Sequence, residues 1–428
     1  MIEIVTADGK AERELLQRLK ERSGEVDRTV TAAVSELIDD VKRNGDEAVR
    51  RYTVQFDGEE PDCFEVPAGA LERAVAECDP AFIAALERAA GNIRAFHQRQ
   101  KQEGWSFTTA QGCLLGQRVR GLHRVGIYVP GGTAAYPSTV LMNTIPARIA
   151  GVGEIVMVTP PPKKGLNNRE ILAAAKVAGV DRVFTVGGAQ AVAALAYGTE
   201  SIPRVDKIVG PGNIYVATAK RLLYGVVDID MIAGPSEILV LADHTANPVY
   251  LAADLLSQAE HDRLASAILI TTDRSVAERT AAELSRQAEK LSRKEILTES
   301  LARFGAGIVC RSMDEAVDFA NELAPEHLEV ATANPMELLE RLDNAGSVFL
   351  GSYSPEPLGD YFAGPNHVLP TSGTARFFSP LSVDSFVKRS SFISYTEEAL
   401  RDAGEDIIKL AETEGLTAHA QSIRVRME

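Results

Sequence analysis

The hydrophobic positions near the start of the chain repeat with the period of an α-helix. Apolar side chains recur every three or four residues between residues 29 and 53. The residues on this repeat are Val34, Leu37, Ile38 and Val41. Gly45 follows two basic residues, a combination typical of a helix end. A second helical pattern begins after Pro67, so residues 1 to about 100 are predicted to be mainly helical.

From about residue 124 the pattern changes to short, continuous apolar runs rich in β-branched residues. These runs occupy residues 125–129, 154–159, 182–186 and 207–210. Alanine-rich helical patterns lie between them, and two of these end in the same Ala-Gly-Val phrase, where glycine suits the left-handed residue after a helix. Strand, glycine loop, helix and strand in this order predict a parallel, doubly wound sheet.

The same pattern returns later in the chain, with apolar runs at 237–243, 267–273, 307–310 and 347–351. Two α/β units are therefore expected, with the N-terminal helical region packed on one of them. After about residue 380 the apolar runs stop, and amphipathic helical segments remain, separated by glycines. This tail is too small for a core of its own and is expected to pack on another surface, in this subunit or in a partner.

Length, charge and cysteine content narrow the class of protein. A chain of 428 residues exceeds the roughly 250–300 residues at which a single core stops growing, so at least two domains are expected. The net charge of -15 argues against nucleic acid and anionic membranes as partners, because both bind basic surfaces. No apolar run of about 18 residues and no secretory signal are visible. Four scattered cysteines are typical of a reducing compartment, so a cytoplasmic protein is expected.

Three glycine-rich segments each follow a predicted strand and precede a predicted helix, at residues 129–138, 186–193 and 209–219. At the carboxyl ends of parallel strands, such loops can present backbone N–H groups to a phosphate. They can equally be no more than tight turns between strand and helix. The GxGxxG fingerprint with a following acidic residue is absent, so the loops alone are a weak indication of a dinucleotide site.

The best indication of a metal site lies in the segment 247–262. This segment is predicted to be one helix, with Asn247 as its N-cap and Pro248 in its first turn. Gln258 and His261 are three residues apart and therefore share one face of that helix. A polar pair with this spacing is most often solvated surface, so the pair needs further support.

The histidines supply part of that support, because four of the seven lie in segments of unusual composition. These are His261, His327, His367 and His419. Asp360 and His367 share a Gly/Pro-rich loop, and such loops often carry function. Gln, His and Asp side chains suit zinc as nitrogen and oxygen ligands, which would leave Glu326 and His327 for proton transfer. Spacing alone assigns none of these roles, because the residues are far apart in the sequence.

Together these segments resemble the histidinol dehydrogenases, and the resemblance covers almost the entire chain. Its motifs in the second half are AGPSE at 233–237, SQAEHD at 257–262, APEHLE at 324–329, GDY at 359–361, GPNHVLPT at 364–371 and EGLTAHA at 414–420. Its motifs in the glycine loops are YVPGG at 128–132, GAQA at 188–191 and VGPGN at 209–213. So many unusual motifs in one order make a chance agreement negligible.

The resemblance implies oxidation of L-histidinol to L-histidine through L-histidinal, the last step of histidine biosynthesis, in two successive hydride transfers to NAD+. The ligands that it implies for one Zn2+ per subunit are Gln258, His261, Asp360 and His419. The further residues implied to contact the substrate are Ser236, His327 and Glu414. The residues implied to contact NAD+, one from each glycine loop, are Tyr128, Gln190 and Asn213.

The chemistry of this reaction fits the Glu-His pair. Alcohol oxidation needs a base for the hydroxyl proton, and histidine titrates near neutral pH, so His327 is predicted to be that base. The aldehyde must then be hydrated, and Glu326 is predicted to activate the water. A zinc ion with four protein ligands is expected to act as a template for the substrate nitrogens. His367 either supports the site or is structural.

For the fold, the resemblance implies an α/β protein of the aldehyde-dehydrogenase-like class with two related, incomplete Rossmann-like units. The predicted domains are an N-terminal segment 1–25, a first α/β domain from 26–124 and 237–380 with the metal and catalytic residues, a second α/β domain 125–236 with the NAD loops, and a C-terminal helical arm 381–428. Family members are homodimers in which this arm crosses over, so Glu414 and His419 are expected to serve the neighbouring site. The sequence alone also allows an arm that folds back on its own subunit.

Two other functions fit parts of the sequence. A zinc hydrolase would use Glu326 as the general base for a metal-bound water, but it would leave the glycine loops without a purpose. A non-catalytic dinucleotide-binding protein would need neither the Gln/His/Asp/His set nor the Glu-His pair. Reduction of NAD+ on addition of histidinol distinguishes the dehydrogenase from both.

Overall fold

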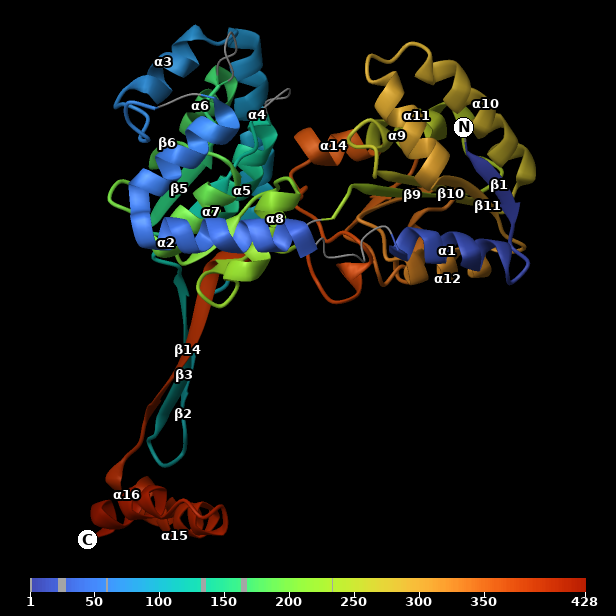
Figure 1. Cartoon of the computed structure of the whole chain (residues 1–428). Helices are drawn as coiled ribbons and strands as arrows, with labels where there is room; N and C mark the ends of the chain where they lie inside the picture. The colour runs from blue at the N-terminus through green and yellow to red at the C-terminus, as the bar shows by residue number, and fades with distance from the viewer. Residues whose placement is uncertain (1, 22–27, 59–60, 132–135, 163–167, 233) are drawn as a thin grey trace.

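The computed structural model shows two lobes and an arm that projects from them (Figure 1). The described residues are 2–21, 28–58, 61–131, 136–162, 168–232 and 234–428. Each lobe is built around one parallel sheet. We name the lobes after these sheets, the six-stranded lobe and the five-stranded lobe. The arm begins in a three-stranded antiparallel sheet and ends in two helices.

The six-stranded lobe has the strand order β1-β11-β10-β9-β12-β13, and all paired strands are parallel. Its strands are β1 (Glu3–Thr6), β9 (Glu237–Ala242), β10 (Ser266–Thr271), β11 (Gly305–Val309), β12 (His327–Ala331) and β13 (Ser347–Leu350). Its helices are α1 (Ala11–Glu21), α9 (Pro248–Ala259), α10 (Arg274–Ala288), α11 (Lys294–Phe304), α12 (Met313–Leu323), α13 (Met336–Leu339) and α14 (Glu356–Tyr361). The strand β1 lies in a region predicted to be mainly helical, because four residues are too few for a periodic pattern.

Helices cover both faces of this sheet, which explains why its strands are apolar along their whole length. Successive residues of β9 alternate between two separate hydrophobic clusters. Ile238 and Val240 pack with α9, α10 and α11, whereas Leu239 and Leu241 pack with α1 and α12 on the opposite face. Figure 1 shows these two helix layers above and below the sheet.

The five-stranded lobe has the strand order β6-β5-β4-β7-β8, again with parallel pairs. Its strands are β4 (Arg124–Tyr128), β5 (Glu154–Thr159), β6 (Arg182–Thr185), β7 (Lys207–Val209) and β8 (Asp228–Ile229). Its helices are α2 (Arg28–Asp57), α3 (Ala70–Glu77), α4 (Pro80–Gln98), α5 (Pro137–Ala150), α6 (Arg169–Ala178), α7 (Gly188–Tyr197) and α8 (Ile214–Leu223). The two α/β units predicted from the apolar runs are therefore both present.

The long helix α2 packs on the five-stranded lobe. Its buried residues, including Val34 and Leu37, share a hydrophobic cluster with β5, β6, α7 and α8. Helix α4 joins the cluster on the opposite face of that sheet. This packing differs from the predicted grouping of residues 26–124 with 237–380. An amphipathic stripe shows that a helix is buried on one side but carries no information about which sheet it covers. At Gly45, where a helix end was predicted, the backbone is non-helical, with a φ of +50°, and a kink divides α2 into two helical parts.

The arm contains strands that the sequence pattern did not predict. Its sheet pairs β3 (Leu114–Gly121) with both β2 (Trp105–Thr108) and β14 (Val387–Ser394). Most side chains of β14 are exposed, so the strand lacks the apolar run that marks a buried strand. Helices α15 (Glu397–Thr413) and α16 (Thr417–Met427) follow at the tip, as the helical pattern of the tail predicted.

The segment between α14 and the arm connects the two lobes. It contains the short 3-10 helices η1 (Thr374–Arg376) and η2 (Val383–Phe386). Asn92 of α4 donates to the carbonyl oxygen of Phe362 at 2.8 Å, and Asn366 donates to that of Met142 in α5 at 2.7 Å. Polar side chains and backbone groups thus tie this segment to the five-stranded lobe.

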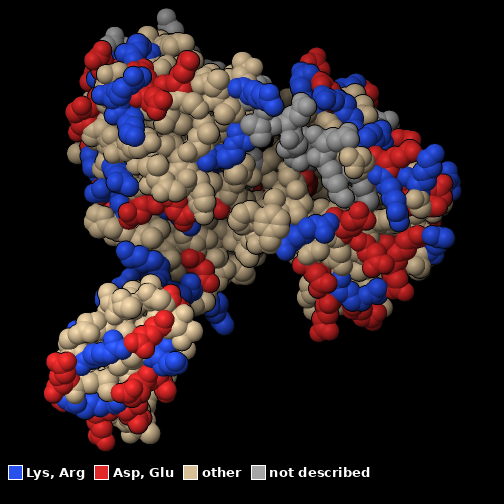
Figure 2. All heavy atoms as spheres, turned by 60° about the horizontal axis from the view of Figure 1, so that its bottom comes forward, with Lys and Arg blue, Asp and Glu red and all other residues tan. Residues whose placement is uncertain are grey.

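The surface carries charges of both signs. On the face drawn in Figure 2, acidic and basic side chains lie side by side on the arm helices. Several of these charges are paired, such as Arg401 with Glu397. Among the described residues, no helix is both long enough and apolar enough to cross a membrane.

Candidate active site

The candidate site lies where strands of the six-stranded sheet begin. His327 is the first residue of β12, and Glu237 is the first residue of the neighbouring β9. Gln258 lies in the last turn of α9, a helix that starts as predicted with the Asn247 side chain accepting from the N–H of Val249. The end of one helix and the starts of two strands thus bring together residues that are far apart in the sequence.

The Nδ1 atom of His327 has two partners at hydrogen-bonding distance. It lies 3.0 Å from Nε2 of Gln258 and 3.0 Å from the backbone carbonyl oxygen of Glu237. An unprotonated Nδ1 accepts from the Gln258 amide, whereas a protonated Nδ1 donates to the carbonyl oxygen. The ring can therefore exchange its proton at this nitrogen and keep a partner in either state.

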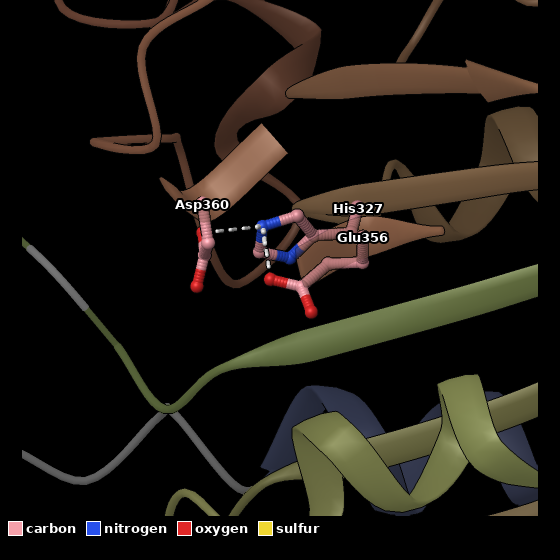
Figure 3. Close-up of side chains that lie close together, drawn as sticks. All are labelled: His327, Glu356 and Asp360. Atoms are coloured by element: carbon pink, nitrogen blue, oxygen red, sulfur yellow. Dashed lines mark ion pairs between the residues drawn. The ribbon is translucent and has the colours of Figure 1, made fainter. Parts of the chain in front are cut away.

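The Nε2 atom of His327 faces two acidic side chains (Figure 3). It lies 3.7 Å from Oε1 of Glu356 and 4.0 Å from Oδ1 of Asp360, both in α14. Asp360 is also close to His367, whose Nδ1 lies 3.7 Å from Oδ1 of Asp360 and 3.0 Å from its backbone oxygen. Positive charge that develops on His327 would therefore meet negative charge at Nε2.

Burial lowers the pKa of His327 to about 4, because removal from water penalises the imidazolium ion. The nearby Asp360 carboxylate and the Glu237 carbonyl oppose this shift only in part. The residue is 4% exposed. At pH 7 the ring is therefore neutral and able to accept a proton.

Glu326 is held beside this ring by a backbone donor. Its Oε2 accepts from the N–H of Glu237 at 2.9 Å and lies 3.7 Å from Nδ1 of His327. The Glu326 side chain is largely buried, so its carboxylate is directed by this contact rather than by solvent. The two residues predicted to transfer protons thus occupy one end of the sheet.

Three buried or half-buried acidic residues that were not predicted lie next to the site. They are Asp254, Glu329 and Glu356. Burial raises the pKa of Asp254 to about 6 and that of Glu356 to about 10, with the Asp360 carboxylate adding to the Glu356 shift. Burial also raises the pKa of Glu329, and the Asp254 carboxylate adds to that shift. Glu329 accepts from the backbone N–H of Glu356 at 2.7 Å.

The spacing of these acids contains a signal that could have identified them. Asp254 precedes Gln258 by four residues in α9, and Glu356 precedes Asp360 by four residues in α14. Residues four apart share one face of a helix. Glu329 follows His327 by two residues in β12, so both project from one face of the strand.

Three of the four predicted zinc ligands lie at this site. Gln258 is fully buried, and within the described part of the chain its Oε1 has no hydrogen-bond partner. His261 lies at the exposed rim of the site. Desolvation of its ring by the surrounding protein lowers the pKa of His261, and the nearby Asp360 carboxylate opposes that shift. A buried acceptor without a partner, next to an imidazole and a carboxylate, fits a bound metal ion.

A second group of side chains has the geometry of a metal site. Ligand atoms of His327, Glu356 and Asp360 all lie within 4.8 Å of one another. This group shares only Asp360 with the predicted set. Among the described residues, the buried Oε1 atoms of Gln258 and of Glu356 both lack a hydrogen-bond partner, so this criterion fits both groups. The metal content of variants distinguishes the two groups.

Glu414 and His419 do not reach this site within their own chain. Glu414 directly follows α15, His419 lies in α16, and both are exposed at the tip of the arm. Figure 1 shows the arm projecting away from both lobes. Ser236, in contrast, directly precedes β9 and therefore lies at the same edge of the sheet as Glu237.

A cavity of about 270 Å³ opens beside His327. Its walls include the apolar side chains of Phe349 and Leu358, and Asp360 and His367 add polar groups. This volume suits a small ligand that is held by a few polar contacts. His367, left undecided from the sequence, is therefore a lining residue of the cavity.

The predicted glycine loops meet at the carboxyl ends of strands in the five-stranded sheet. Tyr128 ends β4, and its hydroxyl oxygen accepts from the N–H of Gly188 at the start of α7, at 3.0 Å. Burial raises the pKa of Tyr128 to about 12, so its hydroxyl keeps its proton and can donate. Residues 132–135 of the first predicted loop lie outside the described residues.

The amide side chains of the other two loops also suit a polar ligand. Gln190 is 1% exposed, and among the described residues neither its Nε2 nor its Oε1 has a partner. Asn213 caps α8, its Oδ1 accepting from the N–H groups of Tyr215 and Val216 at 3.0 and 3.1 Å. Its NH₂ group is not needed for capping. The buried Gln190 amide without partners among the described residues, beside loops at strand ends, fits a dinucleotide.

Comparisons with known proteins show the family of this chain. A profile of the histidinol dehydrogenase family matches residues 20–427. The chain belongs to the histidinol dehydrogenase family. The histidinol dehydrogenase of Clostridium acetobutylicum is 56% identical over 425 residues, which cover 99% of each chain. That of Bacillus cereus strain ATCC 10987 is 55% identical over 427 residues, covering 100% of this chain and 99% of the other.

A solved structure extends the likeness to three dimensions. The crystal structure of histidinol dehydrogenase from Elizabethkingia anophelis is 39% identical and superposes with a TM-score of 0.93, covering 100% of this chain and 98% of that chain. The predicted family, the α/β fold class and the prediction of an enzyme are thereby confirmed. As a histidinol dehydrogenase, the enzyme is an oxidoreductase of histidine biosynthesis.

Proposed function

We propose that the enzyme oxidises L-histidinol to L-histidine through L-histidinal, in two successive hydride transfers to NAD+, and that it uses one Zn2+ per subunit. The observation that supports this proposal is the environment of the His327 side chain. This neutral, buried imidazole contacts Gln258 at one nitrogen, faces the Asp360 carboxylate at the other and borders the cavity. Alcohol oxidation requires such a base where the hydroxyl proton leaves.

Gln258, His261 and Asp360 would hold the zinc ion, together with His419 of the partner subunit. The unpartnered Oε1 of Gln258 supports this assignment, because a buried acceptor is costly unless something binds it. When bound, zinc supplies a Lewis-acid template for the imidazole and amino nitrogens of the substrate. Glu414 of the partner subunit and Ser236 would complete the substrate contacts.

Tyr128, Gln190 and Asn213 would bind NAD+, which accepts the hydride when bound. The protonated Tyr128 hydroxyl supports this, as does the Gln190 amide without partners among the described residues. The three loops lie at one end of the parallel sheet, where open α/β sheets commonly bind ligands.

In the first oxidation, His327 takes the hydroxyl proton of histidinol as the hydride leaves. A base with a depressed pKa is weak in the free site, so its protonated form needs stabilisation in the transition state. Asp360, which lies 4.0 Å from Nε2, supplies negative charge for that purpose. The Glu237 carbonyl oxygen accepts from Nδ1 when that nitrogen is protonated.

In the second oxidation, Glu326 takes a proton from the water that adds to the carbonyl carbon of histidinal. Because that proton stays on Glu326, the adduct is the monoanion of the aldehyde hydrate, which carries one hydroxyl group. His327 removes that hydroxyl proton as the second hydride leaves, and the product is the carboxylate of histidine. The backbone N–H of Glu237 keeps Glu326 beside the ring, so the two residues can act in turn on one substrate.

We also propose a cytoplasmic homodimer in which the arm of each subunit completes the neighbouring site. Apart from the exposed Glu414 and His419 at its tip, the arm exposes large apolar side chains. These are Trp105, Phe107, Ile393 and Leu410, each more than half exposed. Exposed apolar patches commonly mark contact surfaces. The four free cysteines agree with a reducing compartment.

The direct test follows NADH absorbance when L-histidinol and NAD+ are added to the purified protein, with and without a chelator. We expect NADH to form, chelation to abolish its formation and added Zn2+ to restore it. A zinc hydrolase or a non-catalytic dinucleotide-binding protein would not reduce NAD+ with this substrate.

A further inference from the structure

A buried ion pair lies beneath the third glycine loop. Lys220 belongs to α8, and Asp230 directly follows β8. Their charged groups are in direct contact, and their side chains are 3% and 2% exposed. Burying two charges costs desolvation free energy, so a buried ion pair adds little stability on average. We therefore expect this pair to fix a particular local geometry.

The pair binds both polar backbone groups of one residue, Gly210. Asp230 Oδ2 accepts from the N–H of Gly210 at 2.8 Å, and Lys220 Nζ donates to the carbonyl oxygen of Gly210 at 2.9 Å. Gly210 has a φ of +113°, and a Cβ there would lie 2.1 Å from the carbonyl oxygen of Tyr128. Only glycine can turn this close to β4, so two buried charges hold the chain at a point where it bends sharply.

The loop is also fixed at its other end. Asn213 caps α8 through the N–H groups of Tyr215 and Val216. Between the two ends, a Cβ at Gly212 would lie 2.3 Å from the Val216 side chain, so the loop lies directly on α8. The backbone from Gly210 to Asn213 is thus anchored by the ion pair on one side and by the helix cap on the other.

We propose that Lys220 and Asp230 are positioning residues for NAD+ binding, because they hold the loop that presents Asn213 and keep it against Tyr128. This inference rests on the proposed function, in which Asn213 and Tyr128 contact NAD+. Both charged side chains are buried under the loop and do not touch the cofactor. Their removal should therefore weaken NAD+ binding and leave the metal and substrate groups of the six-stranded lobe unaffected.

The test is the double variant K220M/D230N. Methionine keeps most of the length of lysine without its charge, so no unpaired charge is buried. Asparagine keeps one acceptor oxygen for the N–H groups of Gly210 and Met231, which bond the two carboxylate oxygens of Asp230. The carbonyl oxygen of Gly210 loses its donor. We expect the KM for NAD+ to rise by about tenfold, the order of one lost hydrogen bond, while kcat at saturating NAD+ stays within about twofold. Zinc content and the KM for L-histidinol should not change.

The control removes a more exposed ion pair from the same lobe, with side chains 33% and 40% exposed. Arg182 and Glu65 pair at 2.7 Å at the start of β6, at the opposite end of the strands from the loops. R182M/E65Q should lower stability to some degree but leave the KM for NAD+ unchanged. Equal rises of this KM in the two double variants would show a general structural effect and overturn the inference.

A third variant separates failure of the inference from failure of the proposed function. N213D keeps the capping oxygen and removes the side-chain N–H donor. If N213D raises the KM for NAD+ and K220M/D230N does not, the inference is wrong and the proposed NAD+ site stands. If neither raises it, the loop is not the NAD+ contact and both fall. If K220M/D230N does not fold, K220Q/D230N is the second variant, because it also buries no unpaired charge, and it should raise the KM for NAD+ in the same direction.

Discussion

The amide of Gln258 and the imidazole of His327 are in direct contact, with Nε2 of one 3.0 Å from Nδ1 of the other. The two residues lie 69 positions apart in the sequence, one at the end of a helix and one at the start of a strand. The contact uses the nitrogen of the amide and leaves its buried Oε1 available to a cation. One side chain therefore links the proposed metal ligands to the proposed base.

Zinc content tests which side chains hold the metal. His261→Ala should lose zinc and activity but remain folded, because His261 is at the surface and its replacement leaves the core intact. Glu356→Gln is the control, since Glu356 belongs to the other cluster of ligand atoms and not to the proposed set. It should keep about one zinc per subunit by atomic absorption. Zinc retained in His261→Ala and lost in Glu356→Gln would reverse the assignment.

The two oxidation steps should respond differently to loss of the two proton-transfer groups. Glu326→Gln should slow oxidation of histidinal much more than the first hydride transfer, because only the aldehyde needs an activated water. His327→Gln should slow both by about 10²–10⁴-fold, the usual contribution of a general base. Single-turnover rates with histidinol and with histidinal measure the two steps separately. Equal losses on both substrates for Glu326→Gln would contradict the division of roles.

Stability should fall in mild acid because of His97, a fully buried histidine in α4. Its Nδ1 lies 2.7 Å from Oε1 of Gln100, and Asn366 Nδ2 lies 3.4 Å from its Nε2. Burial lowers its pKa below the ordinary 6.5, and the Gln100 contact opposes this only in part. As the pH falls below about 6.5, this histidine takes up a proton in the unfolded chain before it does so in the folded protein. The free energy of unfolding therefore keeps the full contribution of neutral His97 above that pH and decreases below it.

Urea unfolding of the wild type and of His97→Gln at pH 7.5 and 5.5 measures this effect. Between these values the wild type should lose more stability than the variant, by up to about 1.4 kcal/mol per pH unit in the window between the two pKa values. His327 and His261 contribute to the loss in both proteins, so only the difference is informative. An identical pH dependence in the two proteins would show that His97 does not titrate in this way.

Much of the fold could be predicted from the chain because its strands are buried on both faces. Ile238 and Leu239 point to opposite faces of the sheet and pack in different hydrophobic clusters. Because both faces are covered, the strand is apolar at every position, and such a continuous apolar run is easy to recognise in the sequence. The arm was harder to predict. Strand β14 exposes most of its side chains, and its pairing with β3 joins segments more than 250 residues apart, which no local pattern contains.

The site could be predicted only in part, for a similar reason. Residue types and family motifs predicted Glu326, His327 and Gln258 as site residues. The acids Glu329 and Glu356 were missed, although their spacing places them on the same faces as His327 and Asp360. Charged residues are rarely buried, so a sequence pattern assigns them to the surface. The sequence also does not indicate that the candidate site lies at the amino ends of β9 and β12. Ligands of parallel sheets more often bind at the carboxyl ends of the strands.

Mixing of inactive subunits tests whether the arm crosses between them. If His419 serves the neighbouring site, a heterodimer of His261→Ala and His419→Ala subunits has both defects in one site and none in the other. Under conditions of subunit exchange, activity should return to about half of the wild-type value per heterodimer. If the arm serves its own chain, each site retains one defect, and the mixture stays inactive.

The central claim is a four-electron oxidation carried out at one site, and the ratio of NADH formed to L-histidinol consumed tests it most directly. With limiting L-histidinol and excess NAD+, we expect two NADH and one L-histidine for each L-histidinol, with no accumulated aldehyde in solution. A ratio of one, with histidinal as the product, would contradict the proposed second oxidation. A ratio of zero would contradict the function itself.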